Sequence, residues 1–391
     1  MPSIVSPNTN KFIQKYAWLD FVRGLAALEV AAGHLKNFLL DGSAQEPSVF
    51  WKGFSVLTAQ GRNAVMVFFV LSGYLIGKHV YHAFKAGRWS WREYAIKRLS
   101  RLWIVLIPAL VLTATWDQIG INIFRSDLYA GTTLYGGSLP NVHSVTSVFT
   151  FNTFFGNALF LQGIAVSSFG INGPLWSLAN EFWYYIIFPL GFYALHGESV
   201  SLWRIASAVL AISLCLALPP ELVLYGLIWL FGFCVVLAEQ HLCKEMSRKM
   251  RFKMTISSFF LFVAAIYLLP RSFKFDPIFY DFATGVSFAV MLFFLTKIAM
   301  PSQTLSKFST TLAEFSYTLY LTHFPFMAFL LCALFGSAAL QVSATAFAIY
   351  FCVLCVTVVY AFCIYFVFER NTGKLQRLLI DRLCRSGFNE R

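Results

Sequence analysis

Apolar stretches long enough to cross a lipid bilayer recur along the whole of this 391-residue chain. An α-helix needs about 20 consecutive apolar residues to span the hydrocarbon core. Charged residues make up only 12% of the chain, against about 25% in a soluble globular protein. Inside lipid each backbone polar group must find a partner within the protein, and a continuous helix provides one for all of them. The sequence therefore predicts an all-α integral membrane protein.

We predict about ten transmembrane helices. They cover residues 17–40, 62–80, 99–118, 174–196, 202–219, 221–239, 254–270, 281–299, 314–335 and 344–368. A further apolar stretch, 148–166, contains Asn, Gln and Gly and is predicted to be re-entrant or interfacial. These ranges define one membrane domain, 17–368, between an N-terminal segment, 1–16, and a basic tail, 369–391.

The net charge of +12 is explained by membrane topology rather than by nucleic-acid binding. If the N-terminus is cytoplasmic, 23 of the 30 Lys and Arg residues fall in cytoplasmic segments. This asymmetry follows the positive-inside rule and predicts that both termini are cytoplasmic. The eight cysteines all fall in spans or cytoplasmic segments, so we expect reduced thiols, and we predict no metal site.

The first apolar stretch carries a charged residue, Arg23, and a titratable one, His34. Eleven residues make about three helical turns, so both side chains are expected on one face, about 16 Å apart. Ionisable residues inside a membrane normally face a protein interior or a watery cavity and mark a functional site. His34 is therefore a candidate general base. In the alternative, His34 is a structural histidine and Arg23 extends to the cytoplasmic surface.

Arg98 and Arg101 lie where a cytoplasmic segment enters the third span. Residues i and i+3 share a helix face, so the two guanidinium groups could bind phosphate together. The alternative interpretation is an ordinary positive anchor at the membrane surface.

The fourth span is predicted to begin at Pro174, because proline suits the first turn of a helix. Ser177 and Glu181 follow at i and i+4 on one face. A buried carboxylate needs a partner, so Glu181 either supports a catalytic pocket or forms a structural ion pair. Later in the chain, Tyr320 and His323 fall in another span, where His323 taken alone is most simply a core residue.

Taken together, five stretches resemble the acyltransferase-3 family of bacterial membrane acyltransferases. They are L-D-F-V-R-G-L-A-A (19–27) leading to His34, F-F-V-L-S-G-Y-L-I (68–76), R-L-S-R (98–101), L-W-S-L-A-N-E (175–181) and S-Y-T-L-Y-L-T-H-F-P (316–325). The chain departs from the family pattern at Met66, where many members carry a carboxylate, and at Phe182 and Trp183, where E-Q often follows the glutamate.

The resemblance implies an enzyme that transfers an acyl group, often acetyl from acetyl-CoA, to hydroxyls of a surface or exported carbohydrate. It implies His34 as catalytic base, Arg23 on the acyl-donor path, and Arg98 and Arg101 as ligands of the CoA phosphates. Glu181, with Ser177, would support the catalytic pocket, while His323 and Tyr320 are further candidates.

The resemblance also implies a multi-pass protein of the bacterial inner membrane, in contact with its lipids. Acyl-CoA would be a co-substrate rather than a permanently bound cofactor. A carbohydrate or lipid-linked glycan would be the acceptor, and glycan-assembly proteins are possible partners. Two rival functions remain at this point: a transporter or flippase for a glycan or organic anion, and a membrane glycan polymerase. An assay for a thioester-dependent product separates all three.

Overall fold

The computed structural model describes residues 7–42, 48–124, 129, 145–196, 201–242, 246–336 and 339–385. The ends of the predicted N-terminal and C-terminal segments, 1–6 and 386–391, lie outside these ranges. Each of the ten predicted spans falls on a helix. Among the described residues, seven helical segments are long and apolar enough to cross a membrane. The predicted all-α membrane fold is confirmed, whereas the count of ten spans and the side of the termini stay predictions.

The chain folds as two compact units, each assembled from three separate parts of the sequence. Unit 1 contains residues 1–26, 62–89 and 183–313. Unit 2 contains residues 27–61, 90–182 and 314–391. The helices α1 (Pro7–Leu39) and α8 (Trp176–Leu195) are each divided between the two units.

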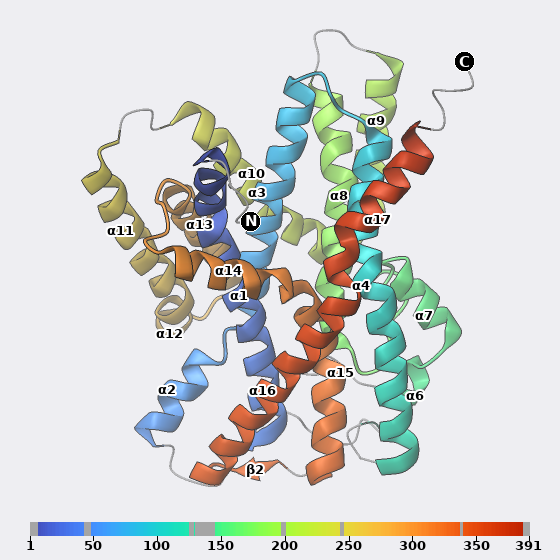
Figure 1. Cartoon of the computed structure of the whole chain (residues 1–391), viewed down its shortest axis with the longest axis vertical. Coiled ribbons are helices and arrows are strands. Elements are labelled where there is room, and N and C mark those ends of the chain that lie inside the picture. Colours follow the sequence, from blue (N-terminus) through green and yellow to red (C-terminus); the bar gives the residue numbers. More distant parts are fainter. Residues whose placement is uncertain are drawn as a thin grey trace, which may run out of the picture. The chain divides into compact units, whose positions relative to one another are not determined.

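In its described residues, unit 1 consists of parts of α1 and α8 together with seven further helices, several of which are labelled in Figure 1. These are α3 (Gly61–Lys85), α9 (Leu202–Ala217), α10 (Pro220–His241), α11 (Arg248–Tyr267), α12 (Leu269–Ser272), α13 (Pro277–Leu295) and α14 (Gln303–Glu314). The helix α13 packs against both α10 and α11.

Glycines allow α3 and α10 to cross at backbone contact. A Cβ atom on Gly73 would overlap the carbonyl oxygen of Trp229, and a Cβ on Gly232 would overlap that of Val70. Small residues are what allow helices to approach this closely in a membrane protein. The spacing of Gly73 and Gly77 in the sequence is therefore explained by packing, as small residues four apart in a helix predict.

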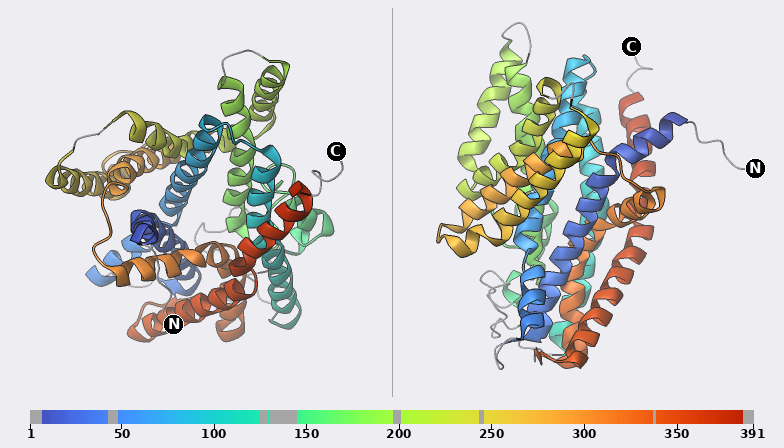
Figure 2. Two further views of the ribbon diagram at one scale, coloured as in Figure 1. Left: turned by 45° about the horizontal axis from the view of Figure 1, so that its top comes forward. Right: turned by 90° about the vertical axis from the view of Figure 1, so that its left-hand side faces the viewer.

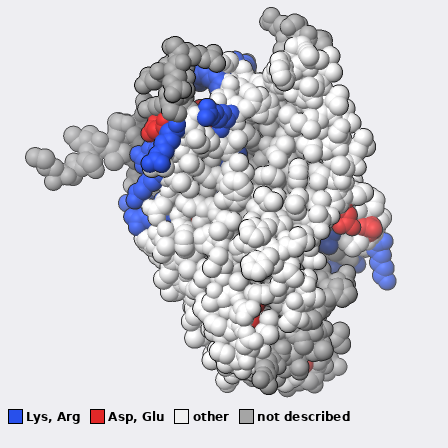
Figure 3. Space-filling model, turned by 90° about the vertical axis from the view of Figure 1, so that its right-hand side faces the viewer, with Lys and Arg blue, Asp and Glu red and all other residues white. Residues whose placement is uncertain are grey.

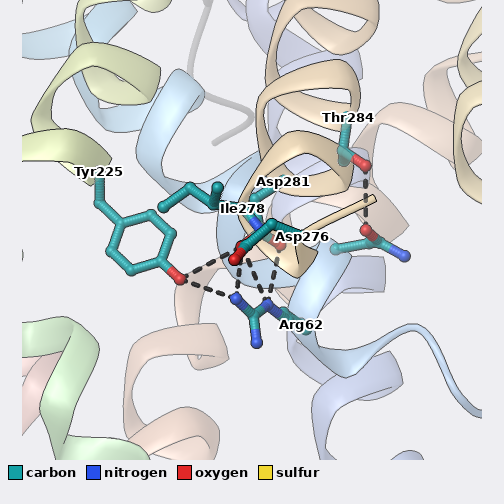
Figure 4. Close-up of polar contacts among 7 residues, drawn as sticks. Arg62, Tyr225, Asp276, Ile278, Asp281 and Thr284 are labelled. Atoms are coloured by element: carbon teal, nitrogen blue, oxygen red, sulfur yellow. Dashed lines mark hydrogen bonds and ion pairs between the residues drawn. The ribbon is translucent and has the colours of Figure 1, made fainter. Parts of the chain in front are cut away.

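An ion pair with a buried carboxylate joins three helices of unit 1 (Figure 4). The guanidinium of Arg62, at the start of α3, donates through Nε and Nη2 to the Asp281 carboxylate on α13, with distances of 2.6–3.0 Å. Asp281 is 2% exposed, and the Tyr225 hydroxyl on α10 donates to it at 3.2 Å. One turn away, Thr284 donates to the Asn63 side chain at 2.9 Å. Since a buried carboxylate is costly without such partners, this network fixes α3 against α13.

Unit 2 consists of the rest of α1 and α8, further helices and one short pair of strands. The helices are α2 (Val49–Leu57), α4 (Trp91–Ile119), α6 (Val145–Val148), α7 (Phe151–Ala158), α15 (Ser316–Phe335), α16 (Ala344–Val367) and α17 (Thr372–Ile380). The strands β1 (Leu40–Asp41) and β2 (Leu340–Gln341) pair in parallel. Short helical turns lie at Gly120–Phe124, Gly173–Leu175, Glu369–Asn371 and Asp381–Arg385.

The centre of unit 2 is α15, which packs against α4 and against α16 (Figures 1 and 2). The helix α17 lies along α4, so most of the predicted tail is part of the folded unit. Within the stretch 148–166 the structure contains α7, which has 8 residues. At 1.5 Å per residue α7 is about 12 Å long, too short to cross a bilayer, in keeping with the prediction that 148–166 does not span.

The face shown in Figure 3 carries a wide surface without charged side chains, with Lys and Arg gathered near its margins. Many large apolar side chains of α9, α11 and α16 are exposed, including Leu216, Phe260 and Val359. Large exposed apolar surfaces are rare on soluble proteins, and here lipid covers them.

Candidate active site

Unit 2 places two histidines next to each other. The imidazole ring of His34, near the end of α1, is stacked on that of His323 in α15, with ring centroids 5.5 Å apart and an angle of 29° between the ring planes. Phe324 meets the His34 ring edge-to-face at 4.9 Å. His34 is partly exposed, whereas the exposed fraction of His323 is 0%. The sequence predicted His34 as a site residue, but not that His323 lies beside it.

The His323 ring is held by its own helix. Its Nδ1 lies 2.9 Å from the carbonyl oxygen of Leu319, one turn earlier. A carbonyl only accepts, so Nδ1 carries the proton and Nε2 of the neutral ring is an acceptor. Within the described part of the chain this buried Nε2 has no hydrogen-bond partner. Buried polar atoms are nearly always paired, so an unpaired one points to a missing partner such as a ligand.

Ser177 and Tyr320, two of the predicted site residues, contact each other in unit 2. Their hydroxyl oxygens lie 2.7 Å apart, both buried, and the Tyr320 hydroxyl also donates to the carbonyl of Pro174 at 3.1 Å. Pro174 lies in a 3₁₀ turn directly before α8, which begins at Trp176. The hydrogen bonds anchor the start of α8 to α15, one turn before His323.

Asn172 is a buried residue that the sequence analysis did not single out. Pro325 interrupts α15 because it has no N–H to donate, which deprives the Leu321 carbonyl of its partner in the helix. The side-chain Nδ2 of Asn172 donates to that carbonyl at 2.9 Å and to Thr113 Oγ1 at 3.2 Å. Pro325 in the sequence indicated that the Leu321 carbonyl needs another hydrogen-bond donor. The sequence could not identify which side chain provides it.

Arg101 is bound to a carboxylate that is almost completely buried. Its Nη2 lies 3.0 Å from Oε1 of Glu369, whose side chain is 1% exposed. The other oxygen, Oε2, accepts hydrogen bonds from the backbone N and the hydroxyl of Thr318, at 3.1 and 2.6 Å. Glu369 lies two residues after the last residue of α16, so its contacts join the end of α16 to α15 and α4. Glu369 is one of three acidic residues in the predicted basic tail, 369–391, so no signal in the sequence singled it out.

Arg98 is in a different environment, although the spacing of the two arginines suggested equivalent roles. Its guanidinium lies over the ring of Tyr94, with the central carbon 5.5 Å from the ring centroid. Within the described ranges, no acidic side chain forms an ion pair with it and its Nε has no hydrogen-bond partner. Of the two arginines, Arg98 is thus the one whose charge no acidic side chain of the described ranges compensates.

Arg101 and the two histidines lie beside different turns of α15. The Tyr317 hydroxyl donates to the Leu102 carbonyl at 3.1 Å, and the Arg101 guanidinium lies 5.7 Å from the Tyr317 ring centroid. His323 follows six residues later, about 9 Å further along the helix axis. The Arg101 guanidinium and the two imidazoles therefore lie beside different turns of α15. An extended ligand with a charged end would require such a separation.

Arg23 and Glu181 are the two remaining predicted site residues, and the charge of Glu181 lies close enough to act on Tyr317 and Tyr320. Arg23 lies in the part of α1 that belongs to unit 1, where it pairs with Asp20 at 3.0 Å. Glu181 is partly exposed on α8, one turn after Ser177. Their predicted roles stay predictions.

Comparison with known proteins places the chain. A model of the acyltransferase domain family matches residues 16–366. The chain belongs to this family. Over 172 residues it is 29% identical to an O-acetyl transferase of Shigella phage Sf6, a match that covers 43% of each protein. The chain thus spans less than half the length of this relative. No solved structure matches the chain. The resemblance seen in the sequence motifs is confirmed, and Glu369 lies three residues beyond the matched range.

Proposed function

We propose that this protein is a membrane-embedded O-acyltransferase that transfers an acyl group, acetyl in the simplest case, from acyl-CoA to a hydroxyl of a carbohydrate. Membership of the acyltransferase family supports the reaction class, and the name of the phage relative supports oxygen as the receiving atom. The observation that carries the proposal is the partly exposed His34 ring next to the buried ring of His323.

In the proposed reaction, one imidazole nitrogen of His34 takes the proton of the acceptor hydroxyl as its oxygen attacks the thioester carbonyl carbon. The new C–O bond forms and the C–S bond breaks, and the protonated His34 then gives its proton to the leaving CoA thiolate, which departs as the thiol. Within the part of the chain described here, His34 makes no hydrogen bond, so its nitrogens are available for this transfer. A second step through an acyl-enzyme is not needed, because donor and acceptor can react directly.

The proposed donor path begins at the arginines. The CoA phosphates would bind Arg98 and Arg101, and the pantetheine arm would extend along α15 to the imidazoles. The separation of about 9 Å between the levels of Tyr317 and His323 suits this arrangement. Since Arg101 already neutralises Glu369, we assign the larger share of phosphate binding to Arg98.

Purified protein, labelled acetyl-CoA and a panel of glycans test the proposal. His34→Ala is expected to abolish labelled product, because general-base catalysis typically contributes 10²–10⁴-fold. His82→Ala is the matched control: His82 is exposed on α3, and this variant should retain wild-type turnover. Product formed at the wild-type rate by His34→Ala would refute the assignment of the base. Transport of a glycan without any thioester-dependent product would favour the transporter instead.

A further inference from the structure

The orphaned Nε2 of His323 is the most informative buried atom in the site. It is an acceptor, because Nδ1–H already donates to Leu319. It has no partner among the residues that the structure describes, and its ring is fully buried. A buried acceptor of this kind points to an O–H or N–H donor from outside the described residues, such as a bound substrate.

The position of this acceptor restricts what the donor can be. The His323 ring is stacked on His34, with 5.5 Å between ring centroids. Because the two rings are adjacent, we infer that a substrate with one hydroxyl at His34 brings a second hydroxyl, on the neighbouring carbon, to the His323 ring. A simple alcohol cannot donate to both rings at once, whereas a vicinal diol can.

We propose that His323 Nε2 accepts a hydrogen bond from the acceptor hydroxyl adjacent to the one that is acylated, so that the site selects vicinal diols, as found in sugar rings. This inference rests on the proposed function. It makes His323 a substrate-binding residue in addition to His34, and it assigns acceptor specificity to α15. The same O–H chemistry could come from an ordered water, and the experiment separates the two sources.

Three variants of His323 provide a matched series. In His323→Gln the amide oxygen can occupy the place of Nε2, which restores an acceptor there. In His323→Asn the shorter amide reaches only the position of Nδ1, so it keeps the contact to Leu319 but loses the acceptor. His323→Phe retains a flat ring beside His34 and loses both nitrogens. Thermal unfolding of each detergent-solubilised variant shows whether it is folded.

Substrate analogues provide the second arm. The probes are methyl glycosides of common hexoses and their monodeoxy analogues, which lack one hydroxyl next to the acylated position. We expect His323→Asn to raise the acceptor KM about tenfold, the effect of one lost hydrogen bond, with the acetyl-CoA KM unchanged and with recovery in His323→Gln. The deoxy analogue should show the same loss with the wild type and no additional loss with His323→Asn, because both changes remove one interaction.

Other outcomes would overturn the inference. If Nε2 holds only a water, His323→Asn lowers kcat while the acceptor KM and the response to the deoxy analogue stay as in the wild type. An equal loss in all three variants would mean that the ring is merely structural. If the wild type transfers no acyl group from acetyl-CoA, the proposed function fails. In that case equilibrium binding of the methyl glycosides and their deoxy analogues still decides the inference, because that measurement needs no donor.

Discussion

The ion pair between Arg101 and Glu369 yields the sharpest test of how the donor end of the site is built. The Arg101 side chain is 38% exposed and that of Glu369 is 1% exposed, so the two partners respond differently to loss of the other. Arg101→Gln leaves a buried carboxylate without a counter-charge and should lower the free energy of unfolding by about 2–4 kcal/mol. Glu369→Gln should cost only about 1 kcal/mol, because Arg101 can turn towards water and the amide oxygen still accepts from Thr318.

The double variant measures the coupling itself. Arg101→Gln with Glu369→Gln removes both charges, so its loss should be smaller than the sum of the single losses by about 1–2 kcal/mol. Urea unfolding in a mild detergent, followed by tryptophan fluorescence, measures these free energies. Arg98→Gln is the control: it breaks no ion pair among the described residues and should change the free energy of unfolding by less than about 0.5 kcal/mol.

The kinetic consequences of the two arginines should be the reverse of the stability effects. Loss of a charge-assisted hydrogen bond to phosphate costs about 1.5–3 kcal/mol, so Arg98→Gln should raise the acyl-CoA KM by about tenfold or more. Glu369→Gln should change that KM much less, because it leaves both arginines in place. Additive stability losses in the double variant, or an acyl-CoA KM unaffected by Arg98→Gln, would refute the division of roles between the two arginines.

Two further predictions concern the packing of Gly73 and the hydrogen bond that Pro325 removes from α15. Gly73→Ala should destabilise the protein by more than about 1 kcal/mol, because its Cβ would overlap the backbone of Trp229. The control is Gly53→Ala, which has open space around it and should be neutral or stabilising by up to about 1 kcal/mol. Thermal unfolding compares the two variants. Asn172→Ala should lower the free energy of unfolding by about 1–3 kcal/mol in the wild type, because the Leu321 carbonyl loses its donor. The loss should be smaller in a Pro325→Ala background, where α15 regains its own hydrogen bond. Equal losses in both backgrounds would contradict this explanation of Asn172.

The sequence by itself determined the class of fold, because membrane spans are encoded locally. A helix in lipid satisfies its own backbone, so a run of about 20 apolar residues is sufficient to predict it. The same local logic located the helix start near Pro174, because proline suits the first turn of a helix. A titratable residue in apolar surroundings likewise made His34 a candidate site residue, and its role as a base stays a prediction.

Only the tertiary structure decided which distant side chains meet. His323 looked like a core residue because nothing in its neighbouring residues indicates that α15 lies against the end of α1. The arginines looked equivalent because i and i+3 share a helix face, yet one faces Glu369, 268 residues further along the chain, and the other does not. Such pairings depend on how helices pack across long loops, which no local pattern encodes. For that reason the chemistry of single residues could be predicted from the sequence, whereas their contacts and the separate roles that follow from those contacts could not.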